Sequence, residues 1–202
     1  MRRVLLLAAL TLCMPVMSWA NSTVTFTNTG GKITLGTGNT LKLSNSLLTS
    51  FTSFSGVTTT GKLGAVSFTT GALTSGTIGG GGTFGAGGSF TIAGNGSNGI
   101  PKGILFTGTF TGPVTWTKNP QPRGNFTYTL NGIVTGTLSN GAMASGGTVQ
   151  FTFDVPNFQQ FSSSVRLNNG ITNVTVPEPG TLGLLGTGLI GIAGLVRRKM
   201  KS

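Results

Sequence analysis

The chain has 202 residues, with 13 Lys and Arg against 2 Asp and Glu, 35 glycines, a single cysteine and no histidine. This composition excludes catalysis through histidine. Once Cys13 is removed, it also excludes disulfides and the His and Cys ligands that zinc prefers. The formal net charge is +11, but the lysines and arginines of the central region stand singly rather than in a cluster. We therefore predict no nucleic-acid interface.

The N-terminal residues have the three parts of a secretory signal peptide. Two arginines stand near the start, an apolar run covers Val4–Leu12, and small residues occupy the positions that a signal peptidase reads. Residues 1–20 are predicted to be a signal peptide that is cut between Ala20 and Asn21. A lipoprotein box at Cys13 is the competing interpretation, although the residue before it is leucine where such boxes carry a small residue.

Residues 21–175 form the predicted domain, and their dominant pattern is alternation with period two. Apolar residues alternate with threonines or other polar residues in Thr23–Thr27, Phe106–Phe110, Phe126–Leu130 and Val149–Val155. Strands with one apolar and one wet face are typical of antiparallel sheets. We predict an all-β fold, an antiparallel β-sandwich or jelly-roll-like body. A parallel β-helix is the alternative, since residues 106–110 and 134–138 form a weak internal repeat.

Three Asn-Gly pairs and one proline mark the predicted connections. Asn131–Gly132 and Asn140–Gly141 stand between alternating runs and predict hairpin turns. Asn169–Gly170 is predicted to separate two short strands. Pro113 predicts a bend or an edge, because proline cannot donate a hydrogen bond to a neighbouring strand.

Two segments depart from this alternation. Apolar residues recur at helical spacing over Leu47–Phe54, with Ser44 or Asn45 as the candidate N-cap. Phe158 and Phe161 have the same spacing over one turn. Each segment is predicted to be a short helix or an irregular loop that closes one end of the sandwich.

The predicted domain offers few groups for catalysis. Asp154 is its only acid, whereas glycosidases ordinarily use two carboxylates and calcium sites several oxygen ligands. Gly94–Gly99 matches the G-x-G-x-x-G pattern, but no helical pattern begins in Ile100–Gly103 to hold a pyrophosphate. We therefore predict no catalytic residue, no cofactor, no metal site and no enzyme activity.

Trp116 and Tyr128 are the one tryptophan and the one tyrosine of the predicted domain. Both alternate with threonines, which favours inward-facing positions in the core of a sheet. The alternative is a stacking platform for sugar rings, because a large ring with one polar end suits a binding surface.

The C-terminal tail, residues 176–202, has three consecutive parts. Val176–Gly180 contains two prolines and resists helix formation. Thr181–Val196 is uncharged and almost wholly apolar, although it is shorter than the about 20 residues of a comfortable membrane span. The last part is a basic end of the kind that stops a span at the cytoplasmic face, and it opens with Arg197, Arg198 and Lys199. An ordinary anchor helix is the simplest interpretation of this tail.

The order of these parts resembles the PEP-CTERM family, whose motif is present here as Val176, Pro177, Glu178 and Pro179. The resemblance covers residues 176–202 only. It implies that an exosortase, a membrane-embedded cysteine transpeptidase, cuts near the motif and passes the protein to the surface. With the signal peptide, it implies export through the inner membrane to the cell surface or extracellular matrix, with signal peptidase and exosortase as partners.

The resemblance describes sorting and does not describe the role of residues 21–175. We expect an exported structural protein of the cell surface or exopolysaccharide, without catalytic activity, that meets extracellular polysaccharide. A carbohydrate-binding module that uses Trp116 is the alternative function.

Overall fold

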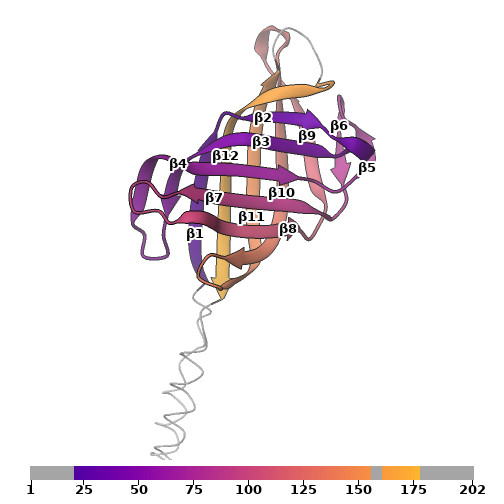
Figure 1. Cartoon of the computed structure of the whole chain (residues 1–202). Helices are drawn as coiled ribbons and strands as arrows, with labels where there is room; N and C mark the ends of the chain where they lie inside the picture. The colour runs from indigo at the N-terminus through magenta and orange to yellow at the C-terminus, as the bar shows by residue number, and fades with distance from the viewer. Residues whose placement is uncertain (1–20, 156–160, 178–202) are drawn as a thin grey trace, which may run out of the picture. The chain divides into compact units, whose positions relative to one another are not determined.

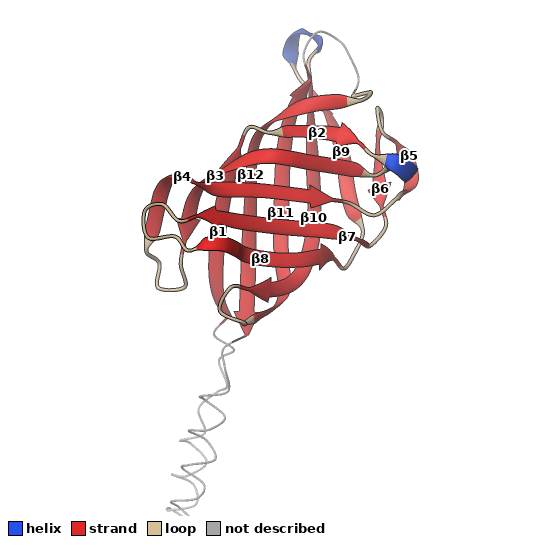
Figure 2. Cartoon of the chain, viewed as in Figure 1, coloured by secondary structure: helices blue, strands red, loops and turns tan. Residues whose placement is uncertain are grey.

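The computed structural model describes residues 21–155 and 161–177. They form strands and two short 3-10 turns (Figure 2), and Ser22–Val176 make up one compact unit. The elements are β1 (Asn21–Thr29), β2 (Lys32–Leu35), η1 (Thr37–Asn39), β3 (Leu41–Thr52), β4 (Thr58–Thr69), β5 (Leu73–Thr77), β6 (Gly81–Phe84), β7 (Gly87–Asn95), β8 (Lys102–Phe110), β9 (Val114–Pro120), η2 (Pro122–Gly124), β10 (Phe126–Leu138), β11 (Met143–Val155) and β12 (Ser164–Pro177).

The strand pairings close into a circuit. β3, β4, β7, β8, β10, β11 and β12 follow one another as hydrogen-bonded neighbours, and both β1 and β2 connect β12 back to β3. Each of the pairings whose register is defined in the described residues is antiparallel. The predicted antiparallel body is therefore confirmed, and the parallel β-helix alternative is wrong.

Two layers result from this circuit (Figure 1). β2, β3, β4, β7 and β8 form one layer, and β1, β12, β11, β10 and β9 cross behind it at a steep angle. Sheets that cross in this way share corners, where strands bend or change partner. β10 does so, since β9 pairs with its first half and β8 with its second half.

β1 and β2 together form one line of pairing against β3. β1 pairs with the second half of β3, and β2 with its first half. Gly30 and Gly31 break this line with φ angles of +66° and +80°. A Cβ atom on Gly31 would stand 2.6 Å from the backbone nitrogen of Ser46. The break requires glycine because both the backbone conformation and the close approach exclude a side chain.

β3 corrects the prediction of a helix or loop over Leu47–Phe54. The segment is strand as far as Thr52, and Phe54 lies in the turn that follows. Two register shifts interrupt the pairing of β3 with β4, one around Asn45, whose φ is +55°, and one after Leu48. Each bulge resets the inward and outward alternation. The apolar residues therefore fall at intervals that imitate helical spacing.

The Asn-Gly pairs behave differently from one another. Asn140–Gly141 forms the predicted turn, between β10 and β11. Asn131–Gly132 lies inside β10 and Asn169–Gly170 inside β12, so these two predictions are wrong. In both pairs a phenylalanine ring occupies the space that a side chain at the glycine position would need. Glycine is therefore required there by close packing and not by a turn. Pro113 lies in the predicted bend, between β8 and β9.

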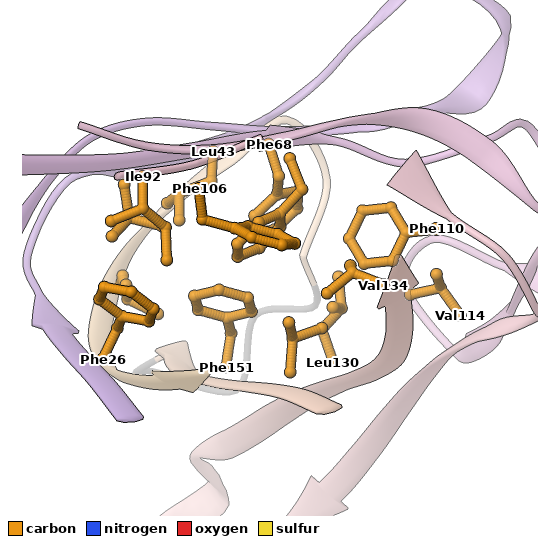
Figure 3. Packing of buried hydrophobic residues seen from close by; sticks show 14 of the residues in the cluster. Phe26, Leu43, Phe68, Ile92, Phe106, Phe110, Val114, Leu130, Val134 and Phe151 are labelled. Carbon is orange, nitrogen blue, oxygen red and sulfur yellow. The ribbon is translucent and has the colours of Figure 1, made fainter. Parts of the chain in front are cut away.

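Phenylalanine rings fill the space between the two layers (Figure 3). Phe68 of β4 and Phe151 of β11 join the layers, with ring centroids 4.9 Å apart. Phe90 stacks on Phe68 at 6.2 Å, and Phe110 meets both rings edge-on at 5.9 Å. Burying each of these side chains stabilises the fold by about 1.5–3 kcal/mol, so this cluster contributes strongly to holding the two layers together.

β9, β6 and β5 extend the second layer beyond the circuit. β6 pairs with β9, and β5 pairs with β6. β5 is the outer strand of this extension, and four of its five residues are exposed. A register shift also interrupts its pairing with β6. A short, irregular edge strand of this kind is a poor template for pairing with another chain.

Candidate functional site

The predicted sorting motif begins inside the last strand. β12 runs to Pro177, and Val176 is only 7% exposed there. The first two residues of the motif therefore belong to the folded sheet. Asn21, on the predicted signal-peptidase cut, is the first residue of β1. Outside the described residues lie Ala20, Glu178, Pro179, Arg197, Arg198 and Lys199.

Two further predictions fall outside the described residues. The apolar segment 181–196 is one of them, and the short helix or loop at Phe158 is the other. Within residues 21–155 and 161–177, no helix has the length and apolar character needed to cross a membrane.

Trp116 and Tyr128 lie side by side on the inner face of β9 and β10. Their rings stack with centroids 4.8 Å apart and planes 20° apart. Solvent reaches 1% of Trp116 and 0% of Tyr128. Phe153 and Phe161 each contact the indole with centroids at 5.6 Å. A platform for sugar rings needs an exposed ring face, so this geometry favours the core interpretation of both residues.

The polar atoms of these two rings hold the turn between β5 and β6. Trp116 Nε1 donates a hydrogen bond to the carbonyl oxygen of Ile78 at 2.8 Å, and Tyr128 Oη donates to that of Gly79 at 2.6 Å. Tyr128 Oη also accepts from the Phe161 amide at 3.1 Å. The sequence did not predict these hydrogen bonds, because their acceptors are backbone carbonyls and every residue type has one.

Asp154 lies exposed on the outer face of β11. One carboxylate oxygen accepts a hydrogen bond from Thr127 Oγ1 at 2.8 Å, and the other accepts from the side-chain amide of Asn168. The carboxylate therefore links β10, β11 and β12, as polar cross-strand pairs do in sheets. In the described part of the chain, no group of three or more His, Cys, Asp or Glu residues is placed to hold a metal ion.

The glycine pattern Gly94–Gly99 spans the end of β7 and the turn that leads into β8. Asn95 Oδ1 accepts a hydrogen bond from the Ser97 amide at 2.9 Å, and the Ser97 carbonyl accepts from the Ile100 amide at 3.0 Å. The segment is a hairpin connection. A strand follows it, where a dinucleotide site would have a helix whose N-terminus holds the pyrophosphate.

The basic residues of the described chain are distributed over seven elements, but two of them meet. Lys32 of β2 and Arg166 of β12 are register partners across the sheet, and both are exposed. Like charges in that position repel each other. Elsewhere, Lys118 Nζ lies 3.8 Å from the ring centroid of Phe126, a cation–π contact. The sequence could not predict the Lys32–Arg166 pair because the two residues lie far apart along the chain.

The fold and the end of the chain together define an all-β domain that runs directly into a C-terminal sorting signal. The family model of the PEP-CTERM protein-sorting motif matches residues 175–199, so the chain carries this motif and the resemblance is confirmed. The motif implies processing by an exosortase and is consistent with export and membrane-associated sorting. No curated protein and no solved structure matches the chain.

Proposed function

We propose that this chain is an exported structural protein of the cell surface or exopolysaccharide matrix, sorted by an exosortase and without catalytic activity of its own. The observation that carries the proposal is the continuity of β12 with the PEP-CTERM motif, which begins at Val176 within the sheet. The sorting signal is therefore joined directly to the β-domain, and this domain is the part that is delivered.

Four properties of the protein support a structural role. The closed circuit of strands leaves few free edges, and a dense phenylalanine core joins its two layers. The chain contains no histidine, and both oxygens of Asp154 are engaged by neighbouring side chains. These features are better suited to a stable structural domain than to an enzyme active site.

The proposed route has two processing steps and one transient membrane contact. Signal peptidase removes residues 1–20, and the apolar segment 181–196 holds the chain in the inner membrane until an exosortase acts. The domain then reaches the cell surface or extracellular matrix, where polysaccharide is the abundant partner. A carbohydrate site at Trp116 is the weaker candidate, because that ring is buried.

We expect the surface form of the protein to begin at Asn21 and to end at or after Pro177. Val176 is 7% exposed in the last strand, so a cut before it would remove a core residue and shorten β12. Intact-mass spectrometry of protein recovered from the cell surface measures both ends at once. A surface form that retains residues 181–202 would contradict exosortase processing and identify an ordinary anchor.

Two variants sharpen this experiment. Glu178→Ala changes the motif inside the matched residues and should leave the unprocessed chain in the membrane fraction. Lys201→Ala lies outside the matched residues 175–199 and should be processed as the unaltered chain is. Normal processing of Glu178→Ala would show that this motif residue is not needed for sorting.

A further inference from the structure

A groove of about 510 Å³ crosses the outer face of the second layer. Its lining comes from β9, β10, β11 and β12 and from Pro113 in the bend before β9, and none of the residues that line it carries a charge. Its volume lies within the range of about 300–1,000 Å³ that is usual for ligand sites. The outward side chains that matter here are Thr115, Asn131, Ile133, Thr148, Gln150 and Asn173.

The groove forms where β10 changes partner. β9 pairs with β10 as far as Asn131, and β8 takes over at Val134. Between these points the carbonyl oxygen of Ile133 accepts a hydrogen bond from the Thr111 amide at 3.1 Å. On the core side, a Cβ atom on Gly132 would stand 3.0 Å from the Phe110 ring. The hollow is therefore built mainly by strands at the corner of the sandwich, and Pro113 of the bend between β8 and β9 adds to its lining.

The register places the outward side chains in two parallel rows. In the first row, Asn131 lies between Thr115 and Gln150 on the neighbouring strands. In the second row, Thr148 lies between Ile133 and Asn173. The rows are two residues apart along each strand, and neighbouring strands lie about 4.8 Å apart. The groove therefore presents a regular array of amides and hydroxyls.

Hydrogen bonds fix the amides of this array. Gln150 Nε2 donates to Asn131 Oδ1 at 3.0 Å, and Thr25 Oγ1 donates to Asn173 Oδ1 at 2.8 Å. Each bond uses part of what a side-chain amide offers. Within the described structure, the NH2 groups of Asn131 and Asn173 and the Gln150 carbonyl oxygen remain for a ligand. Donors and acceptors held in place in this way lower the entropic cost of binding.

Ile133 is the more exposed of two outward isoleucines that line the groove, and the other, Ile171, is the register partner of Gln150. Ile133 points outward from β10 and is 49% exposed. It stands beside the threonines and amides of the groove. A ligand that suits this site has an apolar face for Ile133, hydroxyl edges for the amides, and no charge. Sugar rings have this combination, with C–H faces and hydroxyl rims.

We propose that this groove binds a neutral polysaccharide chain through Asn131, Gln150 and Asn173, with Ile133 against a sugar face. The inference rests on the proposed extracellular role, because that is where the domain meets polysaccharide. It assigns the binding to a site distinct from the buried Trp116. It also separates the groove from the exposed Lys32–Arg166 pair, which would favour an acidic polysaccharide.

The test uses the full chain in a detergent without a sugar headgroup, and affinity electrophoresis against hydroxyethylcellulose, dextran and galactomannan, with polygalacturonate as the acidic counterpart. At least one neutral polymer should bind with saturation. Asn131→Ala and Gln150→Ala should each weaken that binding about tenfold, because each removes hydrogen bonds to the ligand. Ile133→Ser should weaken it on the order of fivefold through lost apolar contact.

Thr107→Ala is the matched control, since Thr107 is an exposed threonine of β8 in the other layer and should bind as the unaltered chain does. If Asn131→Ala unfolds the domain, the exposed Ile133→Ser variant decides. Binding to none of the neutral polymers, preference for polygalacturonate, or unchanged binding in the groove variants would overturn the proposal. These results are independent of surface processing, so a failed groove and a failed sorting route remain distinguishable.

Discussion

Replacing Trp116 with alanine is expected to lower the free energy of unfolding of the domain by about 3–5 kcal/mol. The indole is 1% exposed and stacks on Tyr128 at 4.8 Å. Its removal leaves a cavity beside Phe153 and Phe161 and deprives the Ile78 carbonyl of its buried donor. The loss is a large share of the 5–15 kcal/mol that a domain typically has. Chemical denaturation followed by circular dichroism measures it.

Trp116→Phe separates packing from hydrogen bonding. The phenyl ring keeps most of the contact with Tyr128 but cannot donate to the Ile78 carbonyl, so the cost should fall to about 1–3 kcal/mol. The unaltered indole should emit at short wavelength, as a buried ring does, and added sugars should not shift the emission. Emission typical of a solvent-exposed indole, with a saturable response to glycan, would contradict the core interpretation. It would support the alternative that Trp116 is a stacking platform for sugar rings.

The alternation of apolar residues with threonine predicted the fold class because a sheet with one wet face leaves that pattern directly in the sequence. It also predicted the first part of β10, Phe126–Leu130, since the pairing of this run with β11 contains no bulge. Bulges defeat the same reasoning. The two in β3 shifted the phase over Leu47–Phe54 and imitated a helix.

The Asn-Gly signal failed for a different reason. Asn131–Gly132 has the residues of a tight turn, but Phe110 packs where a side chain at Gly132 would stand. That contact depends on the pairing of β8 with β10, which no local pattern specifies. The sequence pattern therefore predicted Asn131 to be a turn residue. In the structure it lies in the groove beside Gln150.

Trp116 shows the limit that applies to single residues. Its neighbours Thr115 and Thr117 are compatible with an inward ring in a core and with an outward ring on a surface. The register decides between them, because Trp116 stands opposite Leu130, which is fully buried. The sorting motif does not depend on long-range pairing. It could be predicted because it is defined by the order of its parts along one continuous segment of the chain.

Gly136→Ala is expected to destabilise the domain by about 3 kcal/mol, although it adds a single methyl group. Gly108 of β8 and Gly136 of β10 are register partners. A Cβ atom on Gly136 would run into the carbonyl of Thr107, and one on Gly108 into the carbonyl of Thr135. Alanine would therefore force the two strands apart and weaken their hydrogen bonds at the corner where the layers meet.

Gly112→Ala is the matched control for this loss. A Cβ atom at Gly112 meets nothing within 4 Å, and its backbone is not in the left-handed region, so the change should lie within about 0.5 kcal/mol of zero. Thermal and chemical unfolding of the two variants give the comparison directly. Equal stability of Gly136→Ala and Gly112→Ala would contradict the close approach of β8 and β10. A selective loss at Gly136 would show that the pairing of β8 with β10, at the corner between the layers, depends on one pair of glycines.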